Sequence, residues 1–231
     1  MATSYGNLVN LQQVLGDFQQ AKQYYEKALA IQTEKLGPNK VYAVTSYTNL
    51  GLIHQALGDL QLARQYYEKS LAIQTEQLGP NHVYIVATCC ILAQVHQALG
   101  HFQQAKQYYE KALAIQTEQL GPNNVYVATC YCNLALLHQA LGDFQKAKHY
   151  YEKALAVQTE QLGPNHVDLA TSYGNLCQVH EALGDLQLAN QYYEKARAIH
   201  IEQLGPNNVY AATSYTDLGL VHQALGDLQL A

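Results

Sequence analysis

Hydrophobic residues recur along this chain at steps of three and four, the spacing that places side chains on one face of an α-helix. In the stretch from about Val41 to Leu57, the recurring positions are Tyr47, Leu50, Gly51 and His54. In the stretch from about Leu60 to Leu78, they are Leu60, Ala63, Tyr67 and Leu71. Neither stretch contains proline, so the pattern predicts two helices of about 17 residues, each roughly 25 Å long.

Both stretches return with a fixed period of 42 residues. One boundary between them is a Leu-Gly pair, which recurs at Gly16, Gly58, Gly100, Gly142, Gly184 and Gly226. The other is a Leu-Gly-Pro-Asn turn, which recurs at Gly37, Gly79, Gly121, Gly163 and Gly205. Glycine suits the left-handed residue after a helix, and a following proline prevents continuation. Each period is therefore predicted to be an antiparallel pair of a first helix and a second helix.

A period of this length is typical of a stacked array in which each helix pair packs against its neighbours. We predict a single all-α solenoid over residues 1–231. Its repeats lie at approximately 1–40, 41–82, 83–124, 125–166 and 167–208, with a partial repeat at 209–231. Because no polar cap is visible, we expect the chain to be a fragment of a longer array. Its last helix, about 209–225, would expose apolar surface and associate end to end with another molecule.

Small and capping residues also repeat with the period. An aspartate at the start of each second helix is expected to cap it, at Asp17, Asp59, Asp143, Asp185 and Asp227. His101 replaces this aspartate once. Alanine is expected where the two helices of a pair come closest, at Ala63, Ala105, Ala147 and Ala189. Another small residue is expected to let neighbouring first helices approach, at Gly51, Ala93, Ala135, Cys177 and Gly219.

In this spacing the chain resembles the tetratricopeptide repeat. The motif reads here as Tyr47, Leu50, Gly51, His54, Gly58, Asp59, Ala63, Tyr66, Tyr67, Lys69, Ser70 and Leu71. The period exceeds the usual repeat by about eight residues, in the manner of kinesin light chain and nephrocystin-like arrays. The resemblance implies a right-handed superhelix whose first helices line a concave face, where extended peptides or partner helices bind. It also implies a protein-interaction scaffold rather than an enzyme.

Composition narrows the possible partners. The net charge is −5, and the 13 Lys and Arg residues are spread along the chain, which argues against nucleic acid. No apolar stretch approaches the ~20 residues of a membrane span. Five cysteines are an odd number for a disulfide framework, and no basic start precedes an apolar run. These features favour a reducing, cytoplasmic setting and no membrane partner.

No catalytic or cofactor site is indicated. A nucleophile, a base and an orienting group do not converge anywhere in the sequence, so we expect neither catalysis nor a cofactor. One histidine register repeats, at His54, His96, His138, His180 and His222. These side chains would lie roughly 10 Å apart on neighbouring helices, too far to share a metal ion that needs ligands at about 2 Å. Packing at half-buried sites is therefore the interpretation of these histidines.

Candidate binding residues lie on the first helices, which differ between repeats more than the second helices do. Divergence on one face of a constant scaffold is typical of recognition. An amide recurs at Asn7, Asn49, Asn133 and Asn175, with Ile91 and Asp217 interrupting the series. A carboxamide both donates and accepts, which suits an extended peptide backbone. The candidate set is Asn7, Thr45, Asn49, Gln55, Gln97, Asn133, Leu136, Gln139, Asn175, Glu181 and Asp217.

Two alternatives remain open for this set. The amides could instead bond neighbouring helices and have only a structural role. The chain as a whole could be a self-assembling structural or oligomerisation module of a larger multidomain receptor or adaptor, with no peptide-binding role. The preference of the kinesin type for acidic peptides is not expected, because no Lys or Arg occurs in a first helix after Lys40.

Overall fold

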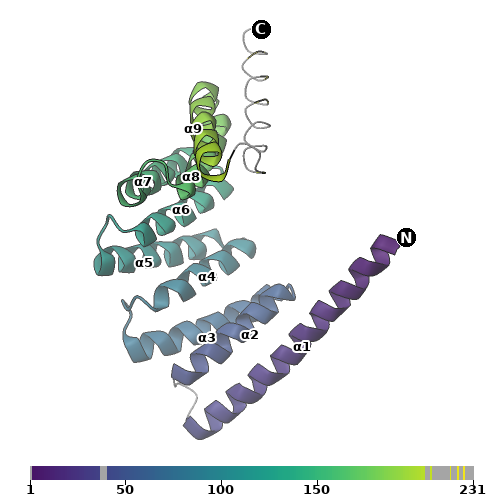
Figure 1. Ribbon diagram of the computed structural model, residues 1–231. Helices are drawn as coiled ribbons and strands as arrows, with labels where there is room; N and C mark the ends of the chain where they lie inside the picture. Colours follow the sequence, from purple (N-terminus) through teal and green to yellow (C-terminus); the bar gives the residue numbers. More distant parts are fainter. Residues whose placement is uncertain are drawn as a thin grey trace. The chain divides into compact units, whose positions relative to one another are not determined.

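The computed structural model in Figure 1 describes residues 2–36 and 41–205 and the single positions 209, 219, 223 and 226. Every element within these residues is an α-helix, which confirms the all-α fold class. The residues group into two compact units, Met1–Ile115 and Gln116–Ala231, and each is considered by itself. One continuous array over 1–231 stays a prediction.

The first unit is built from consecutive helices that pack in chain order. These are α1 (Ala2–Leu36), α2 (Val41–Ala56), α3 (Leu60–Leu78), α4 (Ile85–Ala98) and most of α5 (Phe102–Leu120). Helix α2 packs against both α1 and α3, and α3 packs against α4 (Figure 1). The bounds of α2 and α3 match the two predicted helices to within a residue, because turn glycines mark their ends.

The second unit repeats the same arrangement. Its helices are α6 (Val125–Ala140), α7 (Phe144–Leu162), α8 (Val167–Ala182) and α9 (Leu186–Leu204). Helices α6 and α7 form one pair, α8 and α9 form the next, and α7 packs against α8 between the pairs. The last predicted helix, about 209–225, falls largely outside the described residues, so its role in self-association stays a prediction.

The helix break predicted at Gly16 is wrong, because α1 continues through it as one helix of 35 residues. Asp17 therefore lies inside α1 and begins no helix. A glycine inside a helix costs only about 1 kcal/mol relative to alanine, and no proline interrupts the sequence before Pro38. An unbroken run of backbone hydrogen bonds offsets that cost. Glycine breaks a helix reliably only where φ is positive, as at the later turn glycines, whose φ lies between 73° and 94°.

The predicted aspartate caps are confirmed at two turns. Asp59 Oδ1 accepts a hydrogen bond from the Leu62 backbone N–H at 3.2 Å, and Asp143 Oδ1 accepts one from Lys146 N–H at 3.3 Å. At Asp185 the prediction is wrong, because its side chain makes no capping bond at the start of α9. Its carboxylate lies 3.5 Å from Nδ1 of His180 instead. Asp227 lies outside the described residues.

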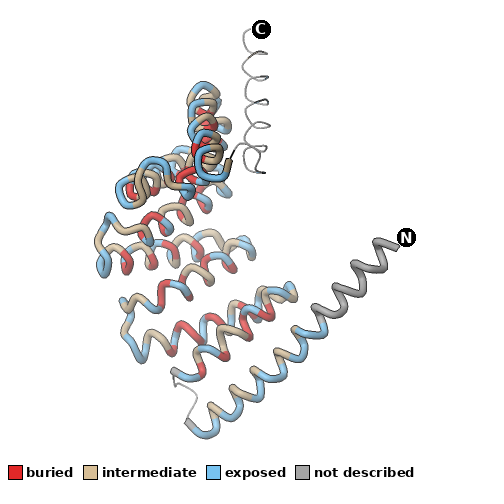
Figure 2. Tube along the Cα trace, in the orientation of Figure 1, coloured by how far each residue is buried: buried red, intermediate tan, exposed pale blue. Residues whose placement is uncertain are grey.

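The small residues lie inside the helix pairs, where Figure 2 shows buried segments on the facing sides. The alanines predicted at the closest approach are fully buried, at Ala63, Ala105, Ala147 and Ala189. Gly51 also allows a close approach within its own pair, beyond the expected contact with a neighbouring first helix. A Cβ there would lie 2.6 Å from Cε1 of Tyr67, on the second helix of the same pair. Cys177, at the same register, likewise donates from Sγ to the backbone oxygen of Ala189 at 3.4 Å.

A hydroxyl on a first helix ties it to the preceding second helix. The bonded pairs are Ser46 Oγ to Gln32 Oε1 at 3.0 Å, Thr88 Oγ1 to Gln74 Oε1 at 2.8 Å, and Ser172 Oγ to Gln158 Oε1 at 2.5 Å. In the fourth repeat Cys130 occupies the register of the hydroxyl. The side chain of Gln116 is buried there, and its Oε1 has no hydrogen-bond partner within the described part of the chain.

We expect Cys130→Ser to raise the free energy of unfolding by about 1 kcal/mol, because the new hydroxyl can donate to Gln116 Oε1. Urea denaturation of the two proteins measures the difference. Cys130→Val is the matched control, since valine has a similar size and no donor. If serine and valine change the stability equally, the missing hydrogen bond at Gln116 is not the cause.

Candidate functional site

The first helices α2, α4, α6 and α8 each keep one strip of side chains towards solvent. In α2, Tyr42, Thr45, Leu52 and Ala56 are exposed and Asn49 is half-buried, at steps of three and four. We call these five registers the open strip. In α6 the open strip consists of Tyr126, Thr129, Asn133, Leu136 and Ala140, with the same pattern of exposure. Because helical side chains at these steps share a face, the strip is one continuous surface on each helix.

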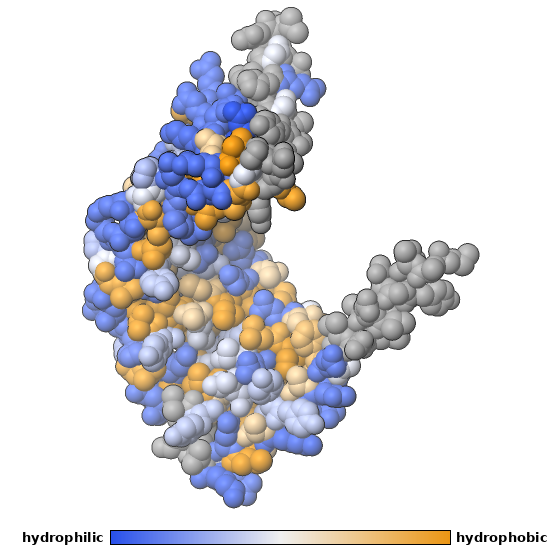
Figure 3. Space-filling model, in the orientation of Figure 1, coloured by the Kyte–Doolittle hydropathy of each residue, from blue (hydrophilic) through white to orange (hydrophobic). Residues whose placement is uncertain are grey.

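The open strips of the other first helices vary in composition. The strip of α4 consists of Ala87, Ile91, Gln94 and Ala98, preceded by the N-cap residue Tyr84. The strip of α8 consists of Asp168, Thr171, Asn175, Gln178 and Ala182. Asp168 is the one charged residue among these four strips, and none carries Lys or Arg. In Figure 3 the face in view over α3 and α4 shows hydrophobic residues among hydrophilic ones.

The predicted site residues divide between the open strip and its edge. Members of the open strip are Thr45, Asn49, Asn133, Leu136 and Asn175. Half-buried residues at its edge are Gln55, Gln97, Gln139 and Glu181. Asn7 lies on α1, but its side chain is outside the described residues, as is the whole of Asp217. The structure therefore places five of the eleven candidates on the face that a partner can reach.

Two glutamines at the edge of the open strip also accept hydrogen bonds from the second helix of their own pair. Tyr67 Oη donates to Gln55 Oε1 at 3.1 Å, and Tyr151 Oη donates to Gln139 Oε1 at 3.2 Å. Gln139 also donates from Nε2 to Oε1 of Gln178 at 3.4 Å, which links α6 to α8. These amides therefore have a structural role within the helix pairs. Their acceptor atoms are engaged before any ligand binds.

The tyrosines of the open strip are missing from the predicted set. Tyr42, Tyr84 and Tyr126 expose 64%, 70% and 61% of their surface, among the highest values for large hydrophobic residues in the described chain. The sequence carried a usable signal, because each tyrosine lies seven residues before the asparagine register and so shares its helix face. Tyrosine offers a broad apolar ring with a hydroxyl, a combination enriched at protein interfaces.

The histidines at the end of each first helix are more deeply buried than predicted. The exposed fractions of His54, His96, His138 and His180 are between 2% and 5%, where half-buried sites were expected. Each ring lies against a tyrosine of its own second helix, with centroids 5.3 to 5.6 Å apart. No cluster of three or more His, Cys, Asp or Glu side chains that could hold a metal ion occurs among the described residues.

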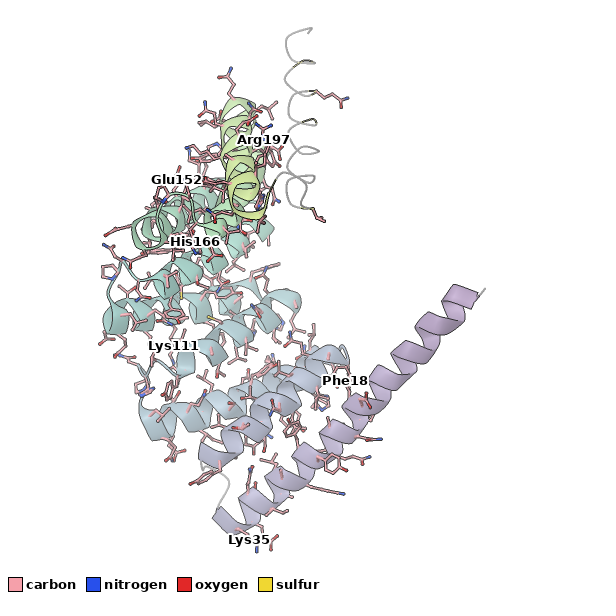
Figure 4. All side chains as sticks on the ribbon, in the orientation of Figure 1. Phe18, Lys35, Lys111, Glu152, His166 and Arg197 are labelled. Carbon is pink, nitrogen blue, oxygen red and sulfur yellow. The ribbon has the colours of Figure 1, made fainter. Side chains whose placement is uncertain are left out.

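Burial moves the pKa values of several titratable groups inside the helix pairs away from neutral pH. Burial raises the pKa of Tyr67 and Tyr109 to about 12, and that of the Cys89 and Cys132 thiols to about 11. A thiol must ionise to act as a nucleophile, so these cysteines are packing groups. Charged side chains such as Glu152 of α7 project from the second helices instead (Figure 4). There Lys106 and Glu110 pair at 3.6 Å.

The model of the family described as tetratricopeptide repeat matches residues 1–76, 42–118, 83–160, 126–200 and 168–231, which together span the chain. The chain therefore belongs to the tetratricopeptide repeat family, as its motif predicted. Tetratricopeptide repeats generally mediate protein–protein interaction. No curated protein matches the sequence. Within the described residues, no helix is sufficiently long and apolar to cross a membrane.

Solved structures support the long, kinesin light chain-like type. BtubC (BKLC) from P. vanneervenii is 28% identical with a TM-score of 0.74, over 85% of this chain and 78% of that one. A putative kinesin light chain from Podosopora anserina, with nearly identical TPR-like repeats, is 30% identical with a TM-score of 0.72, over 87% and 95% of the two chains. MamA, at 22% identity and a TM-score of 0.60 over 84% and 94%, shares the fold alone.

Proposed function

We propose that this chain is a non-enzymatic scaffold that binds an extended peptide or a helix of a partner protein on the open strips of its first helices. One observation carries the proposal: in α2, α4, α6 and α8 the same five registers are exposed or half-buried on one face, while most residues of the opposite face are buried. Across the repeats the buried positions stay alike, whereas the residues on the accessible face differ. This is the arrangement expected of a recognition surface on a constant scaffold.

The chemistry of the strips favours an uncharged partner segment. Asn49, Asn133 and Asn175 can each donate to and accept from a peptide backbone. Tyr42, Tyr84 and Tyr126 add aromatic surface for apolar side chains. Because no Lys or Arg lies on a strip, an acidic segment would gain no ion pair there. Five cysteines are an odd number for a disulfide framework, which supports a reducing, cytoplasmic setting for this interaction.

Selection from a displayed peptide library tests this proposal. Asn133→Ala is expected to weaken binding of a selected segment by roughly five- to tenfold, the effect of losing one hydrogen-bonding group. The melting temperature should stay nearly unchanged, because Asn133 lies on the accessible face. Gln145→Ala is the matched control, since that amide is exposed on the second helix α7. A large loss of thermal stability with intact binding would show that Asn133 is structural.

Self-assembly is the second candidate function, favoured by the near identity of successive repeats. Because the repeats are so alike, a terminal repeat can pack against a second copy of the chain in the way that it packs against the next repeat. Light scattering over a range of concentrations separates the two proposals. Growth in mass with concentration supports assembly, whereas a constant monomer mass favours the scaffold.

A further inference from the structure

We propose that α4 and the turn after it, at His101, form an acid-sensitive element of the first unit, in which protonation of His96 loosens α4 from its packing partners. The element is defined by comparison with its sister repeats, which carry the same histidine in the same buried position. The difference lies in one residue of the turn that follows the first helix.

The sister repeats place a carboxylate beside the histidine. Nδ1 of His54 lies 3.7 Å from Oδ2 of Asp59, and the matching distances are 3.6 Å for His138–Asp143 and 3.5 Å for His180–Asp185. Each aspartate is close enough to balance the charge of an imidazolium. Each of these three histidines therefore has a carboxylate beside its Nδ1.

His96 has no such carboxylate. His101 stands at the aspartate register, and the centroids of the two imidazole rings lie 5.7 Å apart. The exposed fraction of His96 is 5%. Tyr108 of α5 stacks on the ring of His96, with centroids 5.4 Å apart. An imidazolium at this position would be buried next to a second histidine.

The charged groups that face His96 come from α3 and from the turn. Arg64 and Glu68 lie on α3 and pair with each other at 3.6 Å. Burial is the main cause that lowers the pKa of His96 below its ordinary value of 6.5, and the charges of Arg64 and His101 lower it further. Glu68 alone opposes them, and Tyr108 is uncharged near neutrality because burial raises its pKa.

The sign of the pH effect follows from this shift. The unfolded chain binds a proton on His96 at a higher pH than the folded chain does. Stability is therefore lost as pH falls below about 6.5, down to the folded pKa, with no further loss beneath it. The effect cannot exceed about tenfold in the opening equilibrium for each pH unit, the limit for one proton.

Hydrogen exchange at pH 7.5 and 5.5, corrected for intrinsic rates, tests the proposal. Lowering the pH is expected to raise the opening of α4 amides several-fold relative to α2 amides, which lie beside the His54–Asp59 pair. His101→Asp should remove this difference. His101→Asn is the matched control, because asparagine caps a helix as aspartate does but supplies no charge, and it should keep most of the effect.

The reverse substitution tests the same mechanism in the second unit. Asp143→His should make α6 amides acid-sensitive by removing the carboxylate beside His138. His200 of α9 also has a pKa lowered by burial, so the readout must be resolved by helix. Equal acid-induced opening of α2 and α4, or identical behaviour of the aspartate and asparagine variants, would overturn the proposal.

Discussion

Replacing Tyr151 with alanine is expected to lower the free energy of unfolding by about 3–5 kcal/mol, the range for truncating a large buried aromatic side chain. Tyr151 is fully buried on α7 and lies in one core cluster with Ala135 of α6 and with Leu176 and Val179 of α8. Its loss would leave a cavity between three helices that cannot collapse without moving one of them. Denaturation in urea, with the slope checked for two-state behaviour, measures the change.

Tyr151→Phe separates the ring from its hydroxyl. The phenylalanine variant keeps the packing and loses only the hydrogen bond to Gln139, so a loss of about 1 kcal/mol is expected. If phenylalanine costs as much as alanine, the hydrogen bond holds α6 and α7 together and the packing account is wrong. If alanine costs under about 1 kcal/mol, the pair does not depend on this core.

Enlarging Ala147 to leucine is expected to cost about 1–3 kcal/mol, because the added atoms overpack the closest approach of α6 and α7. Ala147 is fully buried and lies in the same cluster as Tyr151. Neighbouring groups can relax only by moving the helices apart, since the site is closed on every side. Thermal or urea denaturation measures the loss.

Ala156→Leu is the control for that substitution. Ala156 lies on the same helix but is exposed, so the larger side chain meets solvent. Leucine is nearly as good a helix former as alanine, and the expected change is only a few tenths of a kcal/mol. Equal effects at the two positions would show that helix propensity, rather than close packing, governs the response.

Much of the fold could be predicted from local signals. The ends of α3 at Leu60 and Leu78 follow from a turn glycine on each side, and the burial of Ala63 follows from the helical period. The continuous helix through Gly16 could not be predicted in this way. Whether a glycine breaks a helix depends on what the resulting halves pack against, and that is a property of the folded chain.

The contact between Gly51 and Tyr67 could not be predicted for a related reason. Periodicity places this residue on the buried side of α2, but it does not say which neighbouring helix lies opposite. The tyrosine ring that fills the space comes from sixteen residues further along the chain, at Tyr67. Helix contacts of this kind depend on how the pair is rotated, which the sequence period alone leaves undetermined.

The candidate site was predictable where repeats diverge on one face. Asn49 and Asn133 were found in this way, and both lie on the open strip. The engagement of Gln55 and Gln139 by tyrosine hydroxyls depends on side-chain geometry that no spacing reveals. Tyr42, Tyr84 and Tyr126 were overlooked because similarity between repeats was interpreted as scaffold, although their helix face marked them as exposed.

Chemical footprinting of tyrosines tests the central claim most directly. A selected peptide is added, and the reactivity of each tyrosine towards iodination is compared with that in the free chain. The account predicts that at least one of Tyr42, Tyr84 and Tyr126 becomes protected, while Tyr24 of α1, 70% exposed at a second-helix register, stays reactive. Protection of Tyr24 with unchanged reactivity at all three strip tyrosines would place the binding surface on the second helices and contradict the account.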